Sequence, residues 1–390
     1  MVKNVNQSIY KNDMKSLFFV FSIDYQVISH RQELIIATKK AGYQITVVAQ
    51  NTGYMETIQN LGITFVDLPI NRTGLSLREE LKTFLFLYKL YKKYKPDIVY
   101  HVSIKVAFWG GLAAKLTVVN NVVNAINGLG VFFSNESHYS LLQKCFLRVF
   151  KFSCNRSNLI TILQNNEDKQ FFVDHKCLNE KQIRVIRGSG VNLNTFEFIK
   201  PLPKDKIIIV FTSRITEEKG VIDLIKAANI LPDRYKKKVI FKIYGLLETN
   251  PKAVNKELLD SLCDDVYIQY FGFEANVKKV LAESDIVVLP SYYREGIPKS
   301  LIDAAAIGRP IVTTEWVGCK ETVVDGYNGF LIPIKSPEAI CEKLMVLIDS
   351  EELRLEMGKN SRKIAEKYFS IEDVIQRHLS IYEELITSKS

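Results

Sequence analysis

Short apolar runs alternate with stretches of helical periodicity along the whole chain. This is the pattern of parallel strands that are covered by helices on both faces of a sheet. In the first half the predicted strands are Leu17–Ile23, Gln44–Ala49, Thr64–Asp67, Ile98–His101, Asn121–Ala125 and Leu159–Leu163. In the second half they are Ile207–Thr212, Val239–Tyr244, Val266–Tyr270, Ile286–Pro290, Pro310–Thr313 and Gly329–Ile332. The pattern therefore predicts a doubly wound α/β architecture in both halves.

The chain has 390 residues, too many for one ordinary core, so we expect two domains of similar size. Prolines and charged residues interrupt the apolar rhythm at residues 201–206, just before a predicted strand, and this segment is the expected linker. We expect a Rossmann-like domain at residues 1–200 and a second at residues 201–369. A final helix, within about residues 370–390, is expected to pack back across the first domain.

The net charge of +9 is concentrated in residues 1–200, which hold 25 Lys and Arg against 14 Asp and Glu. No RNP-type, zinc-finger or basic-zipper signature accompanies these charges. The expected partner is therefore an anionic membrane surface or an acidic substrate, and not a nucleic acid.

The six cysteines contain no CxxC pair, which argues against a zinc site and against a disulfide framework. No apolar run is long enough to span a membrane.

The segment 289–310 carries the strongest chemical signal and is predicted to form strand, loop and helix, with the helix starting near Glu295. Free amides and the positive end of a helix dipole favour an anion, and a diphosphate fits such a crevice. Asp303 would lie about 12 Å further along the helix, so the two carboxylates could hydrogen-bond opposite ends of one extended ligand. The alternative is that both are solvated helix acids. The predicted contacts of this ligand are Glu295, Gly296, Ile297, Ser300 and Asp303.

A second signal is the segment 211–220, which contains Arg214 and Lys219 at the end of a predicted strand. Ligands of open α/β sheets bind at the carboxyl ends of strands. The planar fork of arginine and the point charge of lysine both suit phosphate oxygens. We therefore predict that Arg214 and Lys219 bind the diphosphate, although a surface turn would show the same residues.

Together these motifs resemble the retaining GT-B glycosyltransferases of family 4, over most of the chain. The resemblance implies two Rossmann-like domains that face each other across a cleft. It implies that Arg214 and Lys219 bind the donor diphosphate, that Glu295 contacts the transferred sugar and that Asp303 contacts the ribose. Asp303 stands where the family usually has Glu.

The match is closest to the bacterial subgroup that transfers an N-acetylhexosamine to polyprenyl-diphosphate-linked saccharides. It is carried by segments 29–31, 101–105, 123–130, 188–191 and 310–321. It implies a UDP-sugar donor, with N-acetylgalactosamine favoured, and a role in O-antigen, capsule or glycan assembly. The alternatives are GDP-mannose or a UDP-hexose with a soluble acceptor, or a noncatalytic sugar-nucleotide-binding protein.

The family often has a histidine close to the transferred sugar, which makes His101 the second predicted catalytic residue, with a structural histidine as the alternative. His30, Arg31 and Lys105 are assigned to the acceptor, although a histidine at a helix start can also cap its own turn.

Arg214, Lys219 and the helix dipole would neutralise the departing diphosphate, so neither a metal nor another cofactor is expected. By the family resemblance the diphosphate takes the acceptor proton, and no enzymatic nucleophile is needed.

Two segments combine aromatic, aliphatic and cationic residues, at 77–94 and 139–152. Helices of this kind lie in lipid headgroup layers, although an ordinary Rossmann helix with lysines on its outer face has the same composition. We expect a cytoplasmic protein attached peripherally to the inner face of the plasma membrane.

Overall fold

The computed structural model describes residues 14–71, 76–117, 119–133, 139–248 and 254–388. The first half forms a seven-stranded sheet in the order β3-β2-β1-β4-β5-β6-β7, and every strand pair in it is parallel. Its strands are β1 (Ser16–Ile23), β2 (Gln44–Gln50), β3 (Thr64–Asp67), β4 (Ile98–Val102), β5 (Asn121–Ile126), β6 (Leu159–Leu163) and β7 (Ile183–Val185).

The second half forms a six-stranded parallel sheet in the order β10-β9-β8-β11-β12-β13. Its strands are β8 (Ile207–Thr212), β9 (Val239–Tyr244), β10 (Ile268–Tyr270), β11 (Ile286–Leu289), β12 (Ile311–Thr314) and β13 (Gly329–Ile332). The order of each sheet reverses beside its first strand, between β1 and β4 and between β8 and β11. Ligands of open α/β sheets bind at such reversals.

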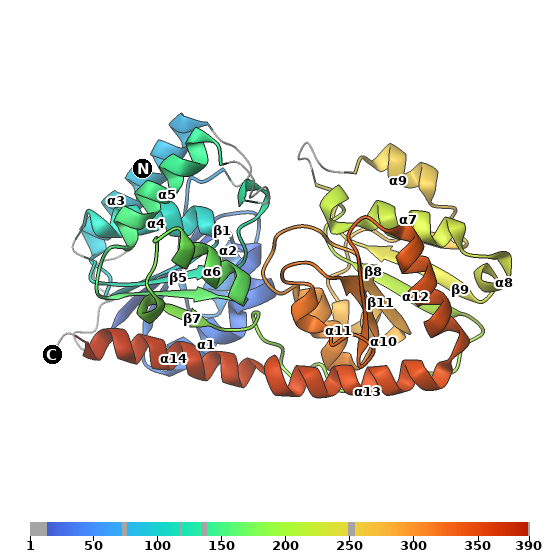
Figure 1. Ribbon diagram of the computed structural model, residues 1–390. Helices are drawn as coiled ribbons and strands as arrows, with labels where there is room; N and C mark the ends of the chain where they lie inside the picture. The colour runs from blue at the N-terminus through green and yellow to red at the C-terminus, as the bar shows by residue number, and fades with distance from the viewer. Residues whose placement is uncertain (1–13, 72–75, 118, 134–138, 249–253, 389–390) are drawn as a thin grey trace.

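Helices cover both sheets (Figure 1). In the first half α3 packs on α4 and α4 on α5, while α1 packs against α14; in the second half α7 packs on α12 and α11 on α10 and α13. The helices of the first half are α1 (Gln32–Lys40), α2 (Met55–Asn60), α3 (Leu77–Tyr94), α4 (Ile104–Lys115), α5 (Leu141–Cys154) and α6 (Asn166–Asp174). Those of the second half are α7 (Val221–Ile230), α8 (Asp233–Lys236), α9 (Lys256–Leu262), α10 (Val277–Glu283), α11 (Lys299–Ile307), α12 (Pro337–Asp349), α13 (Glu351–Tyr368) and α14 (Ile371–Thr387).

The chain crosses between the halves twice, at neighbouring places. Val191 and Ser370 form a parallel bridge, in which the Val191 amide donates to the Phe369 carbonyl. Figure 1 shows α13 running below the second sheet and α14 continuing below the first. The domain limits at residues 200 and 369 remain a prediction. Val191 is buried in the hydrophobic core of the second half, which favours a boundary earlier in the chain, close to Gly190.

The GT-B architecture is confirmed, since two Rossmann-like sheets form as the apolar pattern predicts. The strands in that pattern are all present, and most of them are apolar runs buried between helix layers, whereas the edge strands β3 and β10 are only partly buried. Strand β7 was not predicted, since its three residues carry too short a signal. Within the described residues no helix combines the length and apolar character needed to cross a membrane.

The final helix packs on the first half through buried polar contacts. His378 is fully buried, with its Nε2 2.9 Å from the Tyr100 hydroxyl and its Nδ1 2.6 Å from the Val374 carbonyl. Burial and the charge of Arg31 lower the pKa of His378 to about 3. This histidine is therefore neutral in the folded protein at every pH near neutrality.

We expect the protein to lose stability as the pH falls below 6.5, because His378 then binds a proton in the unfolded state but stays neutral in the folded state. Between pH 7 and pH 5 the cost for this one residue is about 2 kcal/mol. Urea unfolding of the wild type and of His378→Gln at both pH values measures it. The variant should lose less stability than the wild type over this interval; equal losses would contradict the assignment.

Candidate functional site

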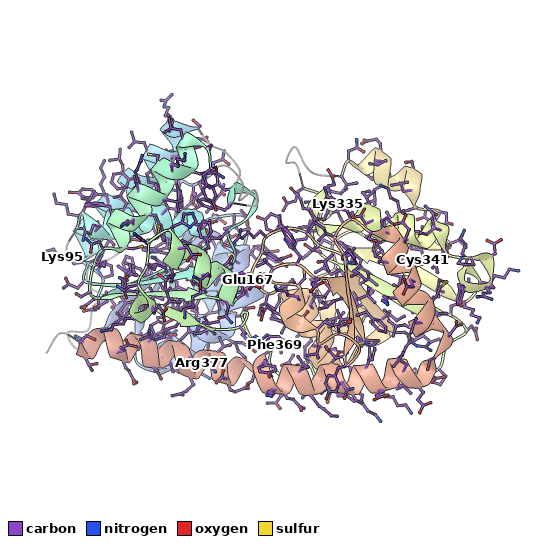
Figure 2. All side chains as sticks on the ribbon, in the orientation of Figure 1. Lys95, Glu167, Lys335, Cys341, Phe369 and Arg377 are labelled. Atoms are coloured by element: carbon purple, nitrogen blue, oxygen red, sulfur yellow. The ribbon has the colours of Figure 1, made fainter. Side chains whose placement is uncertain are left out.

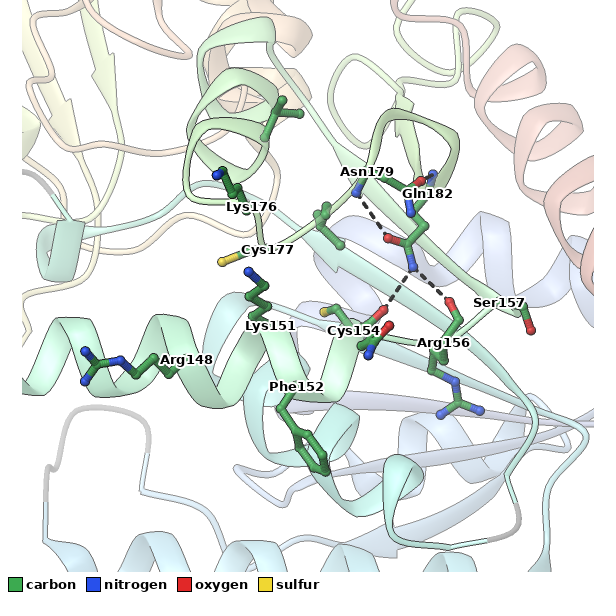
Figure 3. Close-up of a pocket in the computed structure, with 13 residues that line it drawn as sticks. Arg148, Lys151, Phe152, Cys154, Arg156, Ser157, Lys176, Cys177, Asn179 and Gln182 are labelled. Atoms are coloured by element: carbon green, nitrogen blue, oxygen red, sulfur yellow. Dashed lines mark hydrogen bonds between the residues drawn. The ribbon is translucent and has the colours of Figure 1, made fainter.

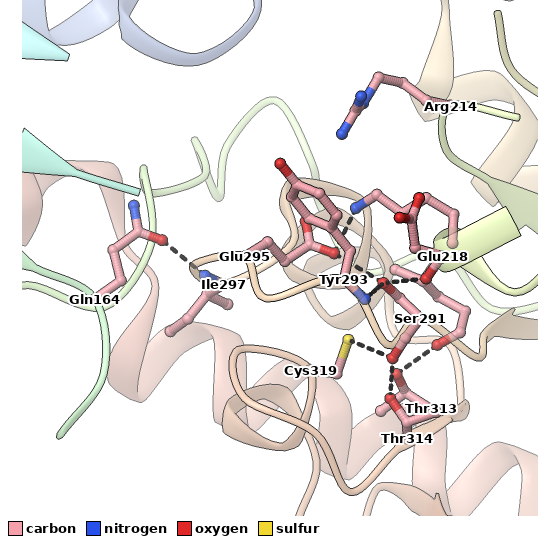
Figure 4. Close-up of polar contacts among 12 residues, drawn as sticks. Gln164, Arg214, Glu218, Ser291, Tyr293, Glu295, Ile297, Thr313, Thr314 and Cys319 are labelled. Atoms are coloured by element: carbon pink, nitrogen blue, oxygen red, sulfur yellow. Dashed lines mark hydrogen bonds and ion pairs between the residues drawn. The ribbon is translucent and has the colours of Figure 1, made fainter. Parts of the chain in front are cut away.

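Loops from both sheets meet at their carboxyl edges. The second half contributes the turn after β8 and the loop after β11, while the first half contributes the segments after β1, β5 and β6. Figure 4 shows Gln164 reaching from the first half toward Ile297, with Glu295, Tyr293 and Arg214 beyond it. The structure therefore brings residues 211–220 and 289–297 together with residues of the first half, and we call this meeting place the crevice.

Lys219 and Glu295 form an ion pair between Nζ and Oε1 at the centre of this crevice. The Ser291 hydroxyl donates to the same carboxylate oxygen at 3.1 Å. Lys219 ends a 3-10 turn (Glu217–Lys219), and Gly220 then adopts a φ of 79°. A Cβ at Gly220 would lie 2.2 Å from the Pro290 carbonyl oxygen, so glycine allows this turn to approach the loop after β11.

Arg214 lies beside Lys219. Its Nη1 pairs with Glu248 Oε1 at 2.7 Å. The Arg214 guanidinium and the Lys219 ammonium each lie 5.5 Å from the centre of the Tyr293 ring. Two cations thus flank one aromatic side chain at the carboxyl end of β8, which gives the crevice the charge that a diphosphate requires.

The prediction that a helix begins near Glu295 is wrong, since α11 begins at Lys299 with Pro298 as its N-cap. The loop before it is not helical, and the first half accepts hydrogen bonds from two of its amides. The Gly296 amide donates to the Asn127 carbonyl at 2.9 Å, and the Ile297 amide donates to Gln164 Oε1 at 2.7 Å.

Two further predicted donor contacts lie on α11. Ser300 is in its first turn and is half-buried. Asp303 is buried and pairs with Lys299, one helical turn earlier, and burial raises the pKa of its carboxyl group. The contact of Asp303 with ribose remains a prediction.

His30 and Arg31 lie on a π-helical turn (Val27–Arg31) after β1, and π turns are frequent at functional sites. The His30 side chain is exposed within the crevice, where surrounding protein and the charges of Lys299, Arg31 and Lys219 lower its pKa. Arg31 is 2% exposed, and its Nη2 donates to Asn127 Oδ1 at 3.3 Å. Its Nε and Nη1 have no hydrogen-bond partner among the described residues.

The structure does not support His101 as a catalytic residue close to the transferred sugar, because its side chain has no exposed surface. Its ring is fully buried between α3, α4 and β5, where Nδ1 lies 2.8 Å from Asn124 Oδ1 and Nε2 lies 2.9 Å from the Tyr91 hydroxyl. A Cβ at Gly110 would lie 2.4 Å from the ring, so α4 packs directly on it. Burial lowers the pKa of His101 to about 4, and the structure supports the alternative of a structural histidine.

Lys105 lies in a different cluster from His30 and Arg31. Its Nζ is 2.5 Å from Glu80 Oε1 and donates to the Asn71 carbonyl at 2.6 Å, and the Trp109 indole donates to the other oxygen of Glu80. An acceptor role for Lys105 remains a prediction.

Sequence reasoning missed Gln164, and it missed the buried ion pair of Arg294 with Asp168 at 3.4 Å. Arg294 also donates to the Phe133 carbonyl at 3.1 Å, so this side chain ties the loop after β11 to the first half. A polar residue just past an apolar strand, as Gln164 is after β6, was the available signal.

A second ion pair crosses between the halves at the surface. Lys320 Nζ lies 2.5 Å from Glu167 Oε1, and Figure 2 places Glu167 at the junction.

A cavity of about 740 Å³ lies at the opposite edge of the first sheet, between the end of α5 and the turn after α6 (Figure 3). Gln182 closes one side of it by donating to the Cys154 and Arg156 carbonyls, both at 2.9 Å. Its charged lining residues are all basic: Arg148, Lys151, Arg156 and Lys176.

Comparison with known proteins agrees with this arrangement. The family described as "Glycosyl transferases group 1" matches residues 194–364, and the family "Glycosyl transferase 4-like" matches residues 19–165. The chain is similar to the N,N'-diacetylbacillosaminyl-diphospho-undecaprenol alpha-1,3-N-acetylgalactosaminyltransferase of Campylobacter jejuni, with 29% identity over 91% of this chain and 95% of that one. It is also similar to the UDP-Gal:alpha-D-GlcNAc-diphosphoundecaprenol alpha-1,3-galactosyltransferase of Escherichia coli, with 25% identity over 89% and 90%.

Among solved structures, a glycosyltransferase from Rickettsia africae superimposes with a TM-score of 0.76 and 20% identity, over 96% of this chain and 99% of that one. This likeness shows the shared fold.

Replacing Arg294 by Met should destabilise the protein by about 3–5 kcal/mol, because the buried Asp168 carboxylate then loses its cation. The double variant Arg294→Met with Asp168→Asn removes both charges and should recover part of that loss. Urea unfolding of both variants measures the difference. A double variant less stable than the Arg294→Met single variant would contradict this account of the interface.

Proposed function

We propose that this glycosyltransferase, whose two halves match the group 1 and 4-like families, moves an N-acetylhexosamine from a UDP-sugar to an undecaprenyl-diphosphate-linked saccharide, with retention of configuration. N-acetylgalactosamine is the favoured sugar, because the similar Campylobacter jejuni enzyme is an N-acetylgalactosaminyltransferase over nearly the same length. The pathway would be the assembly of a bacterial surface polysaccharide or glycan, such as capsule or O-antigen.

The observation that carries the proposal is the contact of Lys219 with Glu295 beside Arg214. A bound diphosphate would lie against the two cations, and the sugar attached to it would reach the Glu295 carboxylate. Arg214 pairs with Glu248 in this structure, so donor binding exchanges one anionic partner for another. The cations then stabilise the charge that develops on the leaving diphosphate.

The reaction breaks the bond between the anomeric carbon and the diphosphate oxygen and forms a bond to the acceptor oxygen on the same face. The acceptor proton passes to the leaving diphosphate, so the protein supplies no nucleophile. Glu295 orients the sugar, and Lys219 with Arg214 holds the leaving group. We assign His101 no part in this step, because its ring is fully buried between α3, α4 and β5.

Arg31 is the residue that best fits the acceptor diphosphate. Two nitrogens of this buried guanidinium have no hydrogen-bond partner within the part of the chain that the structure describes. Such a group is costly unless a ligand completes it, and phosphate oxygens match its geometry. His30 is next to it in the same crevice.

The outer face of the first half supports attachment to an anionic membrane. Several leucines there are exposed on α3 and α5: Leu77, Leu81, Leu85, Leu141 and Leu142. The neighbouring cavity adds only basic charges. By contrast, five residues of the two predicted amphipathic segments are buried in the core: Leu87, Leu90, Tyr91, Leu147 and Phe150.

A UDP-hexose donor is the second candidate, since the similar Escherichia coli enzyme uses UDP-Gal. The two candidates share the diphosphate site and differ in the sugar that Glu295 meets.

Incubation with UDP-GalNAc, UDP-GlcNAc, UDP-Gal or GDP-mannose and an undecaprenyl-diphosphate-linked sugar should extend the acceptor from UDP-GalNAc. Glu295→Gln should lower kcat at least a hundredfold, because the neutral amide binds both Lys219 and the sugar hydroxyls more weakly. Glu315→Gln, at an exposed position after β12, is the control and should keep wild-type activity. Unchanged turnover in Glu295→Gln would refute the role of this residue.

Binding to vesicles that contain anionic phospholipid should be weakened at least tenfold by Leu77→Glu with Leu81→Glu, because two charges then replace an inserting apolar edge. The matched control is Leu202→Glu with Leu258→Glu, which adds the same charge at exposed leucines elsewhere. Cosedimentation with the vesicles measures both. Equal weakening in the two variants would exclude the α3 face as the membrane contact.

A further inference from the structure

A chain of hydrogen bonds crosses from the acceptor side of the crevice to the donor side. Arg31 Nη2 and Gln164 Nε2 both donate to Asn127 Oδ1, at 3.3 Å and 3.0 Å. The other end of the Gln164 amide accepts the Ile297 N–H, and the Asn127 backbone carbonyl accepts the Gly296 N–H. Glu295 immediately precedes Gly296 in the chain. The side chains of Asn127 and Gln164 therefore connect Arg31 to the loop that carries Glu295, whose carboxylate faces the sugar in the proposed function.

The same loops pack backbone against backbone. A Cβ at Gly128, where φ is 100°, would lie 2.5 Å from the backbone of Glu295 and Gly296. A Cβ at Gly296 would lie 2.1 Å from Gln164 Oε1, and one at Gly318 would lie 2.0 Å from the Gly296 carbonyl oxygen. The peptide between Glu295 and Gly296 is therefore enclosed on both sides, and its position depends on residues of the first half.

We propose that Asn127 and Gln164 are positioning residues that hold the Glu295 loop in place from the first half and link its position to Arg31. The inference rests on the proposed function, in which Glu295 faces the donor sugar and Arg31 the acceptor diphosphate. Neither Asn127 nor Gln164 needs to touch the reacting atoms.

Each residue has a separable part in this link. Gln164 is 4% exposed, so its oxygen is the partner of a buried amide that water does not reach easily. Its N–H group and the Asn127 side-chain oxygen form the connection to Arg31. The Nε and Nη1 atoms of Arg31 have no hydrogen-bond partner among the described residues. An acceptor phosphate bound to them would fix the guanidinium, and through Asn127 it would fix Gln164 and the Ile297 amide.

The first experiment compares Gln164→Leu with Gln164→Glu. The leucine variant loses both hydrogen bonds, whereas the glutamate variant keeps an oxygen for the Ile297 amide. With the UDP-sugar that the wild type turns over, Gln164→Leu should lower kcat at least tenfold, and Gln164→Glu should recover part of the loss.

The affinity for UDP alone should stay within threefold of the wild type in both variants, because Arg214 and Lys219 lie in the second half. In the wild type we expect UDP-sugar to bind more tightly than UDP, because Glu295 contacts the sugar. This difference in affinity should disappear in Gln164→Leu. If Gln164→Leu weakened the binding of UDP and of UDP-sugar equally, the variant would have loosened the structure in general, and the proposal would be overturned. Gln170→Leu, a change at an exposed glutamine of α6, is the control and should alter neither affinity.

The link to Arg31 is tested by a double-mutant cycle. Asn127→Ala keeps the backbone carbonyl and removes the side-chain amide with its shared oxygen, so its effect and that of Arg31→Lys on kcat/KM should be non-additive by at least fivefold. Additive effects would overturn the link.

Amide hydrogen exchange separates this proposal from the proposed function, because it needs no substrate. Gln164→Leu should speed exchange in residues 294–297 without changing residues 214–220. If the wild type turns over no UDP-sugar but this selective change occurs, the proposed function fails and the positioning role stands. Unchanged exchange in residues 294–297 would overturn the positioning role whatever the activity.

Discussion

The contact between residues 127–130 and residues 294–296 is made by backbone atoms, and the crevice exists because of it. The Gly296 amide donates to the Asn127 carbonyl, and the Gly130 amide donates to the Arg294 carbonyl at 2.8 Å. Such an approach tolerates no side chain at Gly128. It brings the carboxyl edge of one parallel sheet to the carboxyl edge of the other, so that Arg31 and Glu295 share one crevice.

Charge is distributed unequally around that contact. On the side of the second half each cation has a carboxylate close by, Glu248 for Arg214 and Glu295 for Lys219. On the side of the first half Arg31 is buried, and two of its nitrogens lack a partner among the described residues. A paired site can exchange its anion for a donor diphosphate, whereas the Arg31 site gains new hydrogen bonds when an anion arrives. This difference supports the proposal that the two sides of the crevice bind two different anionic substrates.

The fold followed from the sequence because buried parallel strands are continuous apolar runs, as Leu17–Ile23 and Ile286–Pro290 illustrate. That Lys219 and Glu295 lie at one edge of the second sheet was also predictable, since each follows a strand at its carboxyl end. The start of α11 was not predictable from the sequence. The amides of Gly296 and Ile297 donate hydrogen bonds to residues of the first half, and local helix propensity carries no information about partners so distant in the chain. His101 was misplaced for a related reason. The last side chains of a strand can face either the ligand edge or a covering helix, and the sequence does not distinguish the two. In this fold the glycine at position 110 of α4 leaves room for the His101 ring on the helix side.

The central claim is that a nucleotide diphosphate binds where the turn after β8 meets the loop after β11. Amide hydrogen exchange with and without UDP tests it most directly. The account predicts that UDP slows exchange in residues 213–220 and 291–297, while the basic cavity at the far edge of the first sheet is unaffected. Protection confined to the first half, or no protection at saturating UDP, would contradict it.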